Sequence, residues 1–224
     1  MSIIARMPPP EPAAAAAIHA ARAAIARLGG VMFARGLTDA AGGNISVRVG
    51  QPDGDAICMT PRYAAHATLW RLDSADVLVL DGAGLVQAGS GEASRDAAVH
   101  AAIYRAVPSA GAVVHAHAPF CLVFATAGRP IPARIDAVQP IGDVPVIASG
   151  QDEARAAAAA LAASAERIAS FASAVLVAGH GVIVAGRDLA HAYDALERIE
   201  ANARTILLAP LLGAMNAAAA AAVH

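Results

Sequence analysis

Two hydrophobic patterns alternate along the chain and predict a mixture of strands and helices. Short apolar or alternating runs rich in β-branched residues are typical of strands. They fall at residues 44–49, 56–59, 76–80, 112–118 and 174–184. Longer segments of helix formers predict helices over residues 13–35, 94–107, 119–126, 151–168 and 188–208. The turn sequence Asp81–Gly84 gives the first strands the character of an antiparallel meander.

The strand predicted at residues 112–118 carries two histidines. Successive strand side chains alternate between faces, so His115 and His117 project from the same side. Neutral imidazoles bind divalent transition metals, but a catalytic site usually has three protein ligands. His180 follows a second apolar run and has glycine on both sides, which makes it the candidate third ligand. The alternative is two strand histidines on a polar face, and the apolar flanks together with His180 favour the metal site.

Composition narrows the chemistry that the chain can perform. Its 224 residues are 57% hydrophobic and 15% charged, which fits one substantial core. All 16 basic residues are Arg, and the absence of Lys excludes Schiff-base catalysis, pyridoxal phosphate anchoring and a P-loop. Cys58 and Cys121 stand far apart and are expected in the core.

Net charge and overall hydrophobicity indicate which partners the chain could have and how it is divided into domains. The net charge of −2 and the scattered arginines indicate neither a nucleic-acid nor an anionic-membrane partner. Without an apolar membrane span or the layout of a signal peptide, we expect a soluble cytoplasmic protein. We expect a flexible Pro-rich arm at residues 1–12, one domain at 13–208 and a frayed Ala-rich tail at 209–224.

Polar residues mark three further candidate positions. The Gly42–Gly43 turn leads into a strand with Asn44, Ser46 and Arg48 on one face, where backbone N–H groups and polar side chains could hold an anion. A glycine turn before a strand is more often only a turn. Asp96 and His100 are neighbours on a predicted helix, where the alternative is a surface hydrogen-bonded pair. The Pro-rich segment 128–145 predicts a functional or interface loop.

These residues resemble the motifs of the class II aldolase/adducin family, the family of fuculose-phosphate aldolase and ribulose-phosphate 4-epimerase. The resemblance covers roughly residues 13–208. The matching motifs, in chain order, are GN[VI]S at 43–46, the substrate turn at Thr60–Pro61, SS[ED]xxxH at 94–100, the HxH strand at 114–117 and the last histidine at 180–181.

The resemblance implies a fold, an assembly and a set of roles. It implies a three-layer α/β/α domain around a mainly antiparallel sheet, and a homotetramer with active sites between subunits. His115, His117 and His180 become ligands of Zn²⁺ or Mn²⁺, which stabilises an enediolate as a Lewis acid. Asp96 stands where the aldolases have their catalytic Glu and the epimerases have Asp. Asp136 matches the proton-donating Tyr of fuculose aldolase, on an alignment anchored at Ile131–Pro132.

Substrate contacts are implied for Asn44, Ser46, Thr60 and Ser94, but two arginines depart from the family pattern. Sugar-phosphate aldolases have TP[TS]G at the substrate turn, where this chain has Arg62 and Tyr63 after Thr60–Pro61. Arg95 likewise replaces a small serine before Asp96. A guanidinium binds a planar carboxylate bidentately and stacks on aromatic rings. For Arg62 the alternative is a solvated surface residue, and Arg95 could instead pair with Asp96.

These departures favour a metal-dependent carbon–carbon lyase that decarboxylates a hydroxylated aromatic or related carboxylate. The alternatives are a sugar-phosphate aldolase, then a 4-epimerase, which Asp96 favours. A non-enzymatic adducin-like module comes last, because the histidine set is complete.

Overall fold

The structure is a computed structural model that describes residues 12–51 and 54–221, with side chains described as far as Leu212. The arm predicted at residues 1–12 lies outside this range except for Pro12. The strands are β1 (Asn44–Val49), β2 (Ala56–Met59), β3 (Leu78–Leu80), β4 (Val86–Ala88), β5 (Ala112–Ala116), β6 (Val146–Ile147), β7 (Ala172–Val177) and β8 (Gly181–Gly186). The helices are α1 (Pro12–Ala34), α2 (Ala64–Thr68), α3 (Ala97–Ala106), α4 (Pro119–Thr126), the 3-10 turn η1 (Asp136–Val138), α5 (Glu153–Ala162), α6 (Ala165–Ser170) and α7 (Leu189–Ala221).

One sheet runs through the molecule in the order β4-β3-β2-β1-β5-β8-β7-β6. Among the described strands, only β6 and β7 pair in parallel, and the other neighbours are antiparallel. Because β5 lies at the centre between β1 and β8, the HxH strand is buried and its neighbours are fixed on both edges. The mainly antiparallel sheet predicted through the family resemblance is confirmed.

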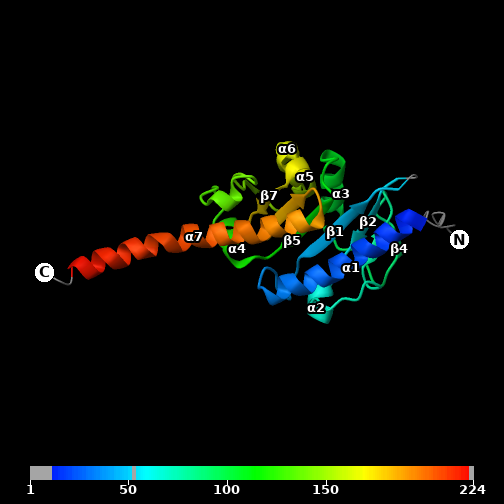
Figure 1. Ribbon diagram of the computed structural model, residues 1–224, viewed down its shortest axis with the longest axis horizontal. Helices are drawn as coiled ribbons and strands as arrows, with labels where there is room; N and C mark the ends of the chain where they lie inside the picture. The colour runs from blue at the N-terminus through cyan, green and yellow to red at the C-terminus, as the bar shows by residue number, and fades with distance from the viewer. Residues whose placement is uncertain (1–11, 52–53, 222–224) are drawn as a thin grey trace.

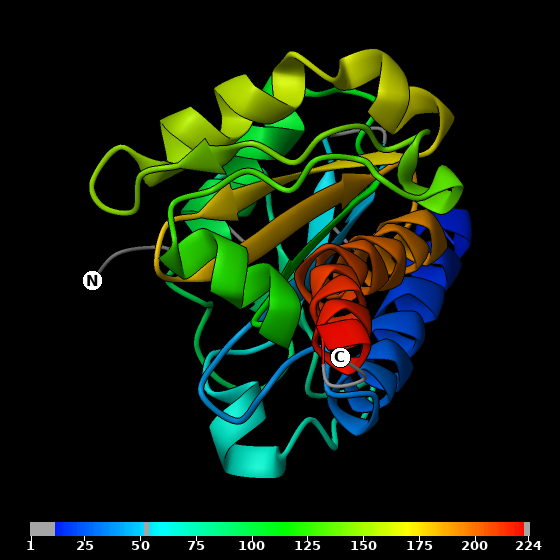
Figure 2. The same ribbon diagram turned by 90° about the vertical axis from the view of Figure 1, so that its left-hand side faces the viewer.

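Helices cover both faces of this sheet, as Figures 1 and 2 show. On one face, α1, α4 and α7 pack over a core that includes Ile25, Val114 and Leu196. On the other face, α3, α5 and α6 pack over a second core that includes Ile103, Leu161 and Ile183. Even-numbered residues of β5 join the first core and Val113 joins the second, which is the alternation expected of a central strand. The three-layer α/β/α architecture is therefore confirmed.

Several element boundaries differ from those that the sequence predicted. The helix predicted over 151–168 is split into α5 and α6 by a break at Ala163–Ser164. The helix expected to end near Leu208 continues as α7 to Ala221, with Pro210 inside it, and the fraying expected of the tail stays a prediction. Alanine is the strongest helix former, which favours this continuation. Figure 1 shows the end of α7 projecting beyond the body of the molecule.

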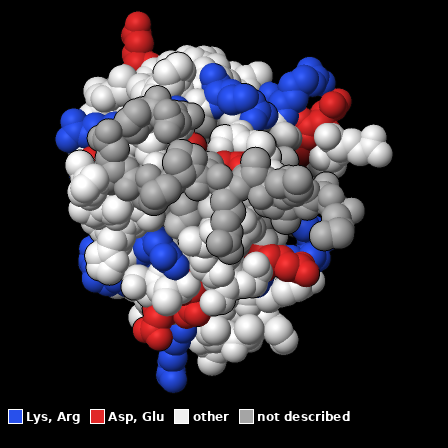
Figure 3. All heavy atoms as spheres, turned by 90° about the vertical axis from the view of Figure 1, so that its right-hand side faces the viewer, with Lys and Arg blue, Asp and Glu red and all other residues white. Residues whose placement is uncertain are grey.

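The charged surface is mixed in the part of the chain that the structure describes. On the face shown in Figure 3, Arg and acidic side chains are interspersed around the residues drawn in grey. None of the described helices combines the length and the apolar content that a membrane crossing requires.

Candidate metal centre and substrate pocket

Three histidines from neighbouring strands meet at the end of β5. His115 lies in β5, His117 directly follows it, and His180 lies in the turn between β7 and β8. The antiparallel pairing of Ala116 with Val182 brings that turn beside the end of β5. The candidate ligand nitrogens of the three rings all lie within 4.8 Å of one another. The structure therefore brings together the three histidines that the sequence singled out.

Glycine at position 181 allows this close approach. A β-carbon on Gly181 would lie 2.5 Å from the carbonyl oxygen of Ala116 and 3.2 Å from the ring of His115. On the other side of His180, Gly179 has a φ of 67°, a conformation that glycine adopts without strain. The Gly-His-Gly sequence is thus required by the turn that places His180 in the cluster.

Three imidazole nitrogens of the cluster lack hydrogen-bond partners among the described residues. Both ring nitrogens of His115 and Nε2 of His117 are buried without a hydrogen bond, although buried polar atoms nearly always have one. Burial, together with the nearby rings of His180 and His117, lowers the pKa of His115 well below its usual range. The ring is therefore neutral at neutral pH and keeps a lone pair available. This donor set fits a divalent metal ion such as Zn²⁺.

Asp39 orients one of the three rings, and the sequence analysis did not identify it. Its Oδ1 lies 3.1 Å from Nδ1 of His117 and accepts hydrogen bonds from the backbone N–H groups of Ala41 and Gly42. With the Nδ1 proton donated to Asp39, Nε2 of His117 is left free to bind a metal. A β-carbon on Gly42 would lie 2.8 Å from Cε1 of His117. The 39–43 turn therefore fits around this ring.

Removing the carboxylate of Asp39 should weaken metal binding. We expect Asp39→Ala to lower the affinity for Zn²⁺ roughly 10- to 100-fold, the usual effect of losing a partner that orients a ligand histidine. Asp39→Asn should have a smaller effect, because the amide oxygen of asparagine can still accept a hydrogen bond from Nδ1 of His117. Competition with a chelator measures the Kd. Asp81→Ala is the matched control, since Asp81 caps a turn in the same way at Ala83 and Leu85. An unchanged affinity in Asp39→Ala would contradict the role.

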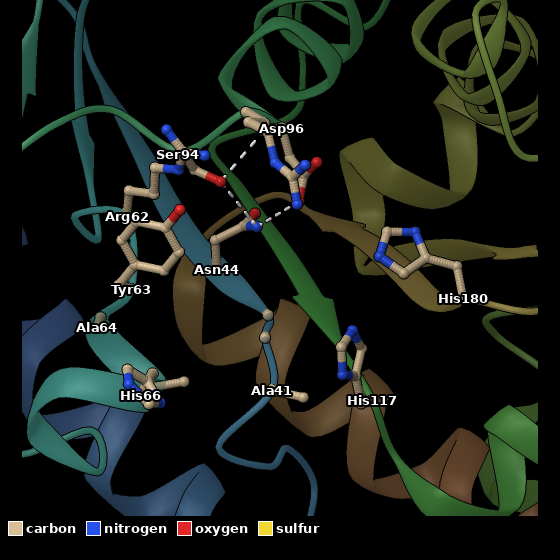
Figure 4. A pocket seen from close by; sticks show the side chains of 14 residues that line it. Ala41, Asn44, Arg62, Tyr63, Ala64, His66, Ser94, Asp96, His117 and His180 are labelled. Carbon is tan, nitrogen blue, oxygen red and sulfur yellow. Dashed lines mark hydrogen bonds between the residues drawn. The ribbon is translucent and has the colours of Figure 1, made fainter.

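Asp96 lies beside the histidines and is held by the strand next to them. Nδ2 of Asn44 donates to Oδ2 of Asp96 at 2.7 Å and lies 3.3 Å from Oγ of Ser94. Asn44 itself stands opposite His115 in the β1–β5 pairing. Figure 4 shows Asn44, Ser94 and Asp96 as one hydrogen-bonded group facing the pocket. The alternative of a surface pair between Asp96 and His100 is wrong, because Nδ1 of the buried His100 bonds Ser46.

Ser46 and Thr60 lie beneath the site and do not line the pocket. Both side chains are fully buried. The hydroxyl of Ser46 lies 2.7 Å from Nδ1 of His100 and 2.8 Å from the hydroxyl of Tyr104, and burial lowers the pKa of His100 to about 4. Oγ1 of Thr60 accepts a hydrogen bond from the backbone N–H of Ile45. The direct substrate contacts expected of Ser46 and Thr60 are thus corrected to supporting contacts under β1 and α3.

Most of the predicted site residues line one pocket in front of the histidines. It encloses about 150 Å³, which is small for a ligand site and suits a compact substrate. The predicted residues that line it are Asn44, Arg62, Ser94, Arg95, Asp96, His117 and His180. Tyr63 and His66 also line it, and neither was assigned a role from the sequence. His66 belongs to α2, a five-residue helix too short to show a periodic pattern.

The two arginines occupy different surroundings at this pocket. The guanidinium of Arg62 lies 3.3 Å from Oε2 of Glu92 and is packed over the ring of Tyr63. The alternative of an Arg62 that is merely solvated is therefore not supported. Arg95 is exposed, and the carboxylate of Asp96 is bonded to Asn44. Both arginines line the pocket, although the guanidinium of Arg62 is shared with Glu92.

Asp136 lies outside the pocket that contains most of the other predicted site residues. It stands exposed on η1, which packs against α7, and it does not line this pocket. Its loop is tied to α7 by Asn202, whose Oδ1 accepts from the backbone N–H groups of Arg134 and Ile135. The catalytic role of Asp136 stays a prediction.

The family profile of the Class II Aldolase and Adducin N-terminal domain matches residues 23–207. Taken with the layered fold and the histidine cluster, this match shows that the chain belongs to the class II aldolase/adducin family.

Similar proteins in this family catalyse different reactions. The chain is 30% identical over 182 residues to a 3-oxo-tetronate 4-phosphate decarboxylase from Haemophilus influenzae, covering 80% of this chain and 82% of that protein. It is 33% identical over 194 residues to a methylthioribulose-1-phosphate dehydratase from Granulibacter bethesdensis, covering 75% and 82%. The solved structure of an L-fuculose 1-phosphate aldolase superposes with a TM-score of 0.74 at 25% identity, covering 87% and 88%.

Proposed function

We propose that this chain is a divalent-metal-dependent lyase that decarboxylates a compact phosphorylated 3-oxo acid. The observation that carries the proposal is the presence of Arg62 and Arg95 in the same pocket as His117, His180 and Asp96. Two guanidinium groups suit a substrate with two anionic ends, and a carboxylate and a phosphate are both bound well by Arg. The similar proteins named as a decarboxylase, a dehydratase and an aldolase support an enzyme.

The substrate class differs from the one that the sequence alone favoured. The sequence favours a hydroxylated aromatic carboxylate, because two arginines replace small residues of the family pattern. Each of the three similar proteins instead has a phosphorylated, non-aromatic substrate in its name. We therefore prefer the phosphorylated 3-oxo acid and keep the aromatic acid as a comparison substrate.

His115, His117 and His180 would hold the metal ion, with Zn²⁺ and Mn²⁺ as the candidates. When bound, it supplies Lewis-acid polarisation of a substrate carbonyl group and so stabilises the negative charge left by the departing carboxyl group. Asp96 would pass a proton from solvent water to the carbon that loses carbon dioxide, because its carboxylate faces the pocket beside Asn44 and can take up a proton before giving it. Asn44 keeps the carboxylate in one orientation. Arg62 and Arg95 bind and orient the substrate anions.

Aldol cleavage of a sugar phosphate is the second candidate. The superposition with L-fuculose 1-phosphate aldolase favours it, as do the amide and hydroxyl donors of Asn44 and Ser94 in the pocket. Both reactions leave the same kind of anion and differ in the product released, carbon dioxide or an aldehyde. We also propose a homotetramer with active sites between subunits, which size-exclusion chromatography with light scattering would test.

Replacing the arginines should separate the two reactions. We expect Arg62→Lys and Arg95→Lys each to raise KM for a phosphorylated 3-oxo acid about 10-fold or more, because lysine keeps the charge but lacks the planar fork. Arg71→Lys, at an exposed arginine outside the pocket, is the control and should match the parent. Carbon dioxide and aldehyde release are measured on 3-oxo-tetronate 4-phosphate, a hydroxyphthalate and fuculose 1-phosphate. If the chain releases an aldehyde from the sugar phosphate, and neither arginine substitution changes that rate, the aldolase function would be established instead.

A further inference from the structure

The short helix α2 is bounded by backbone conformations that are costly for their residues. Among the described residues, the non-glycine residues with positive φ are Tyr63 (64°), Leu69 (50°) and Trp70 (61°). Tyr63 immediately precedes α2, and the other two follow it. Bulky side chains avoid this left-handed region, so such strain persists only where the surrounding structure enforces it. All three strained residues flank one helix at the pocket, so a neighbouring residue must enforce their conformation.

Trp70 is the anchor that enforces this arrangement. Its side chain is fully buried, and its indole N–H donates to the carbonyl oxygen of Asp39 at 3.0 Å. A β-carbon on Gly29 would lie 2.7 Å from Cε3 of the indole ring, so α1 packs directly against it. Because Asp39 also orients His117, the indole fixes α2 relative to the histidine cluster.

The strained backbone presents the side chain of Tyr63 to the pocket. The residue is 61% exposed, although it lines the cavity. The guanidinium carbon of Arg62 lies 4.7 Å from the centre of the Tyr63 ring. The backbone N–H of Arg62 donates to the carbonyl oxygen of Glu92 at 2.8 Å, which ties this turn to the segment carrying Ser94. In Figure 4, the hydroxyl end of Tyr63 points toward Ser94 and Asn44.

We propose that Tyr63 is a specificity-determining residue whose phenol donates a hydrogen bond to the anionic end group of the substrate. Arg62, stacked on the ring, supplies positive charge beside the same group. Glycine would fit the φ of position 63 without strain. Retention of a strained tyrosine is explained by a contact that its side chain makes with the ligand. This inference rests on the proposed function only in taking the substrate to be anionic.

The test measures binding rather than turnover. The metal-loaded full-length chain is titrated by calorimetry with phosphoglycolate, a two-carbon probe that carries a carboxylate and a phosphate. We expect Tyr63→Phe to weaken binding roughly 10-fold, the effect of losing one hydrogen bond to a charged group, and Tyr63→Gly to weaken it further. Leu69→Gly is the matched control. It relieves the same kind of strain at the other end of α2, outside the pocket lining, and should bind like the parent.

Thermal unfolding accompanies each titration. Both glycine variants should melt within about 3 °C of the parent or above it, because relief of the positive φ opposes the added freedom of the unfolded chain. If Tyr63→Gly does not fold, Tyr63→Phe alone decides the proposal. Parent-like binding by Tyr63→Phe, or a parent chain that does not bind the probe, would overturn it. A different result would contradict the proposed function. In that case the parent chain would bind the probe normally but release neither carbon dioxide nor an aldehyde from any substrate.

Discussion

His117→Ala is expected to abolish metal binding and catalysis together. The substitution leaves two histidines, one fewer than the protein ligands of a typical catalytic metal site. It also removes the ring whose orientation Asp39 fixes. Metal analysis of the purified variant should find far less than one ion per chain, and kcat should fall to background. His19→Ala, which removes an exposed histidine on α1, should keep the metal content and the activity of the parent.

Circular dichroism and the melting temperature without metal separate this result from unfolding. Because removal of the buried, unpartnered Nε2 of His117 offsets the lost packing and the lost hydrogen bond to Asp39, the metal-free variant should melt close to the metal-free parent. Full metal occupancy with full activity in His117→Ala would show that the histidine cluster is not the catalytic metal site.

Asp96→Asn is expected to lower kcat about 100-fold or more, the scale of a lost general acid or base. The asparagine amide is similar in size to the carboxylate and its oxygen can still accept from Asn44, so the pocket should keep its shape. Metal content and KM should therefore change little. Steady-state kinetics at saturating metal measure the effect.

The matched control for this change is Asp188→Asn. Asp188 also stands at a helix start, where its Oδ1 accepts from the backbone N–H of His191, but it does not line the pocket. This variant should lose some stability and keep kcat. If Asp96→Asn also lowers the melting temperature and keeps the kcat of the parent, then Asp96 has only a structural role at the start of α3.

Much of the layered fold could be predicted because its signals are local. The apolar run around Val113 and Val114 has the composition of a buried strand, and it forms the centre of the sheet as β5. The alternation of Asn44, Ser46 and Arg48 also held, since all three side chains bond toward α3 or its neighbours. What failed was the placement of helix ends: the Ala-rich composition of residues 151–168 does not predict the break at Ser164, and Pro210 does not end α7.

The histidine cluster was predictable from spacing, whereas its supporting residues were not. Asp39 acts across 78 positions on His117, and only the folded chain shows that contact. Ser46 matched a motif, but a motif does not tell whether a hydroxyl faces the pocket or the core. The strain at Tyr63 is likewise set by the burial of Trp70, a tertiary effect that overrides local preference. An aspartate shortly before a Gly-Gly turn is the signal that could have identified Asp39.

The most direct test of a catalytic metal held by three histidines is a titration of the metal-stripped chain with Zn²⁺ or Mn²⁺. Carbon dioxide release from 3-oxo-tetronate 4-phosphate is followed after each addition. We predict no release without metal, a linear rise with added ion and a plateau at about one ion per chain, as expected of a single catalytic site. Full carbon dioxide release by the stripped chain, unchanged by either metal, would contradict the proposed chemistry.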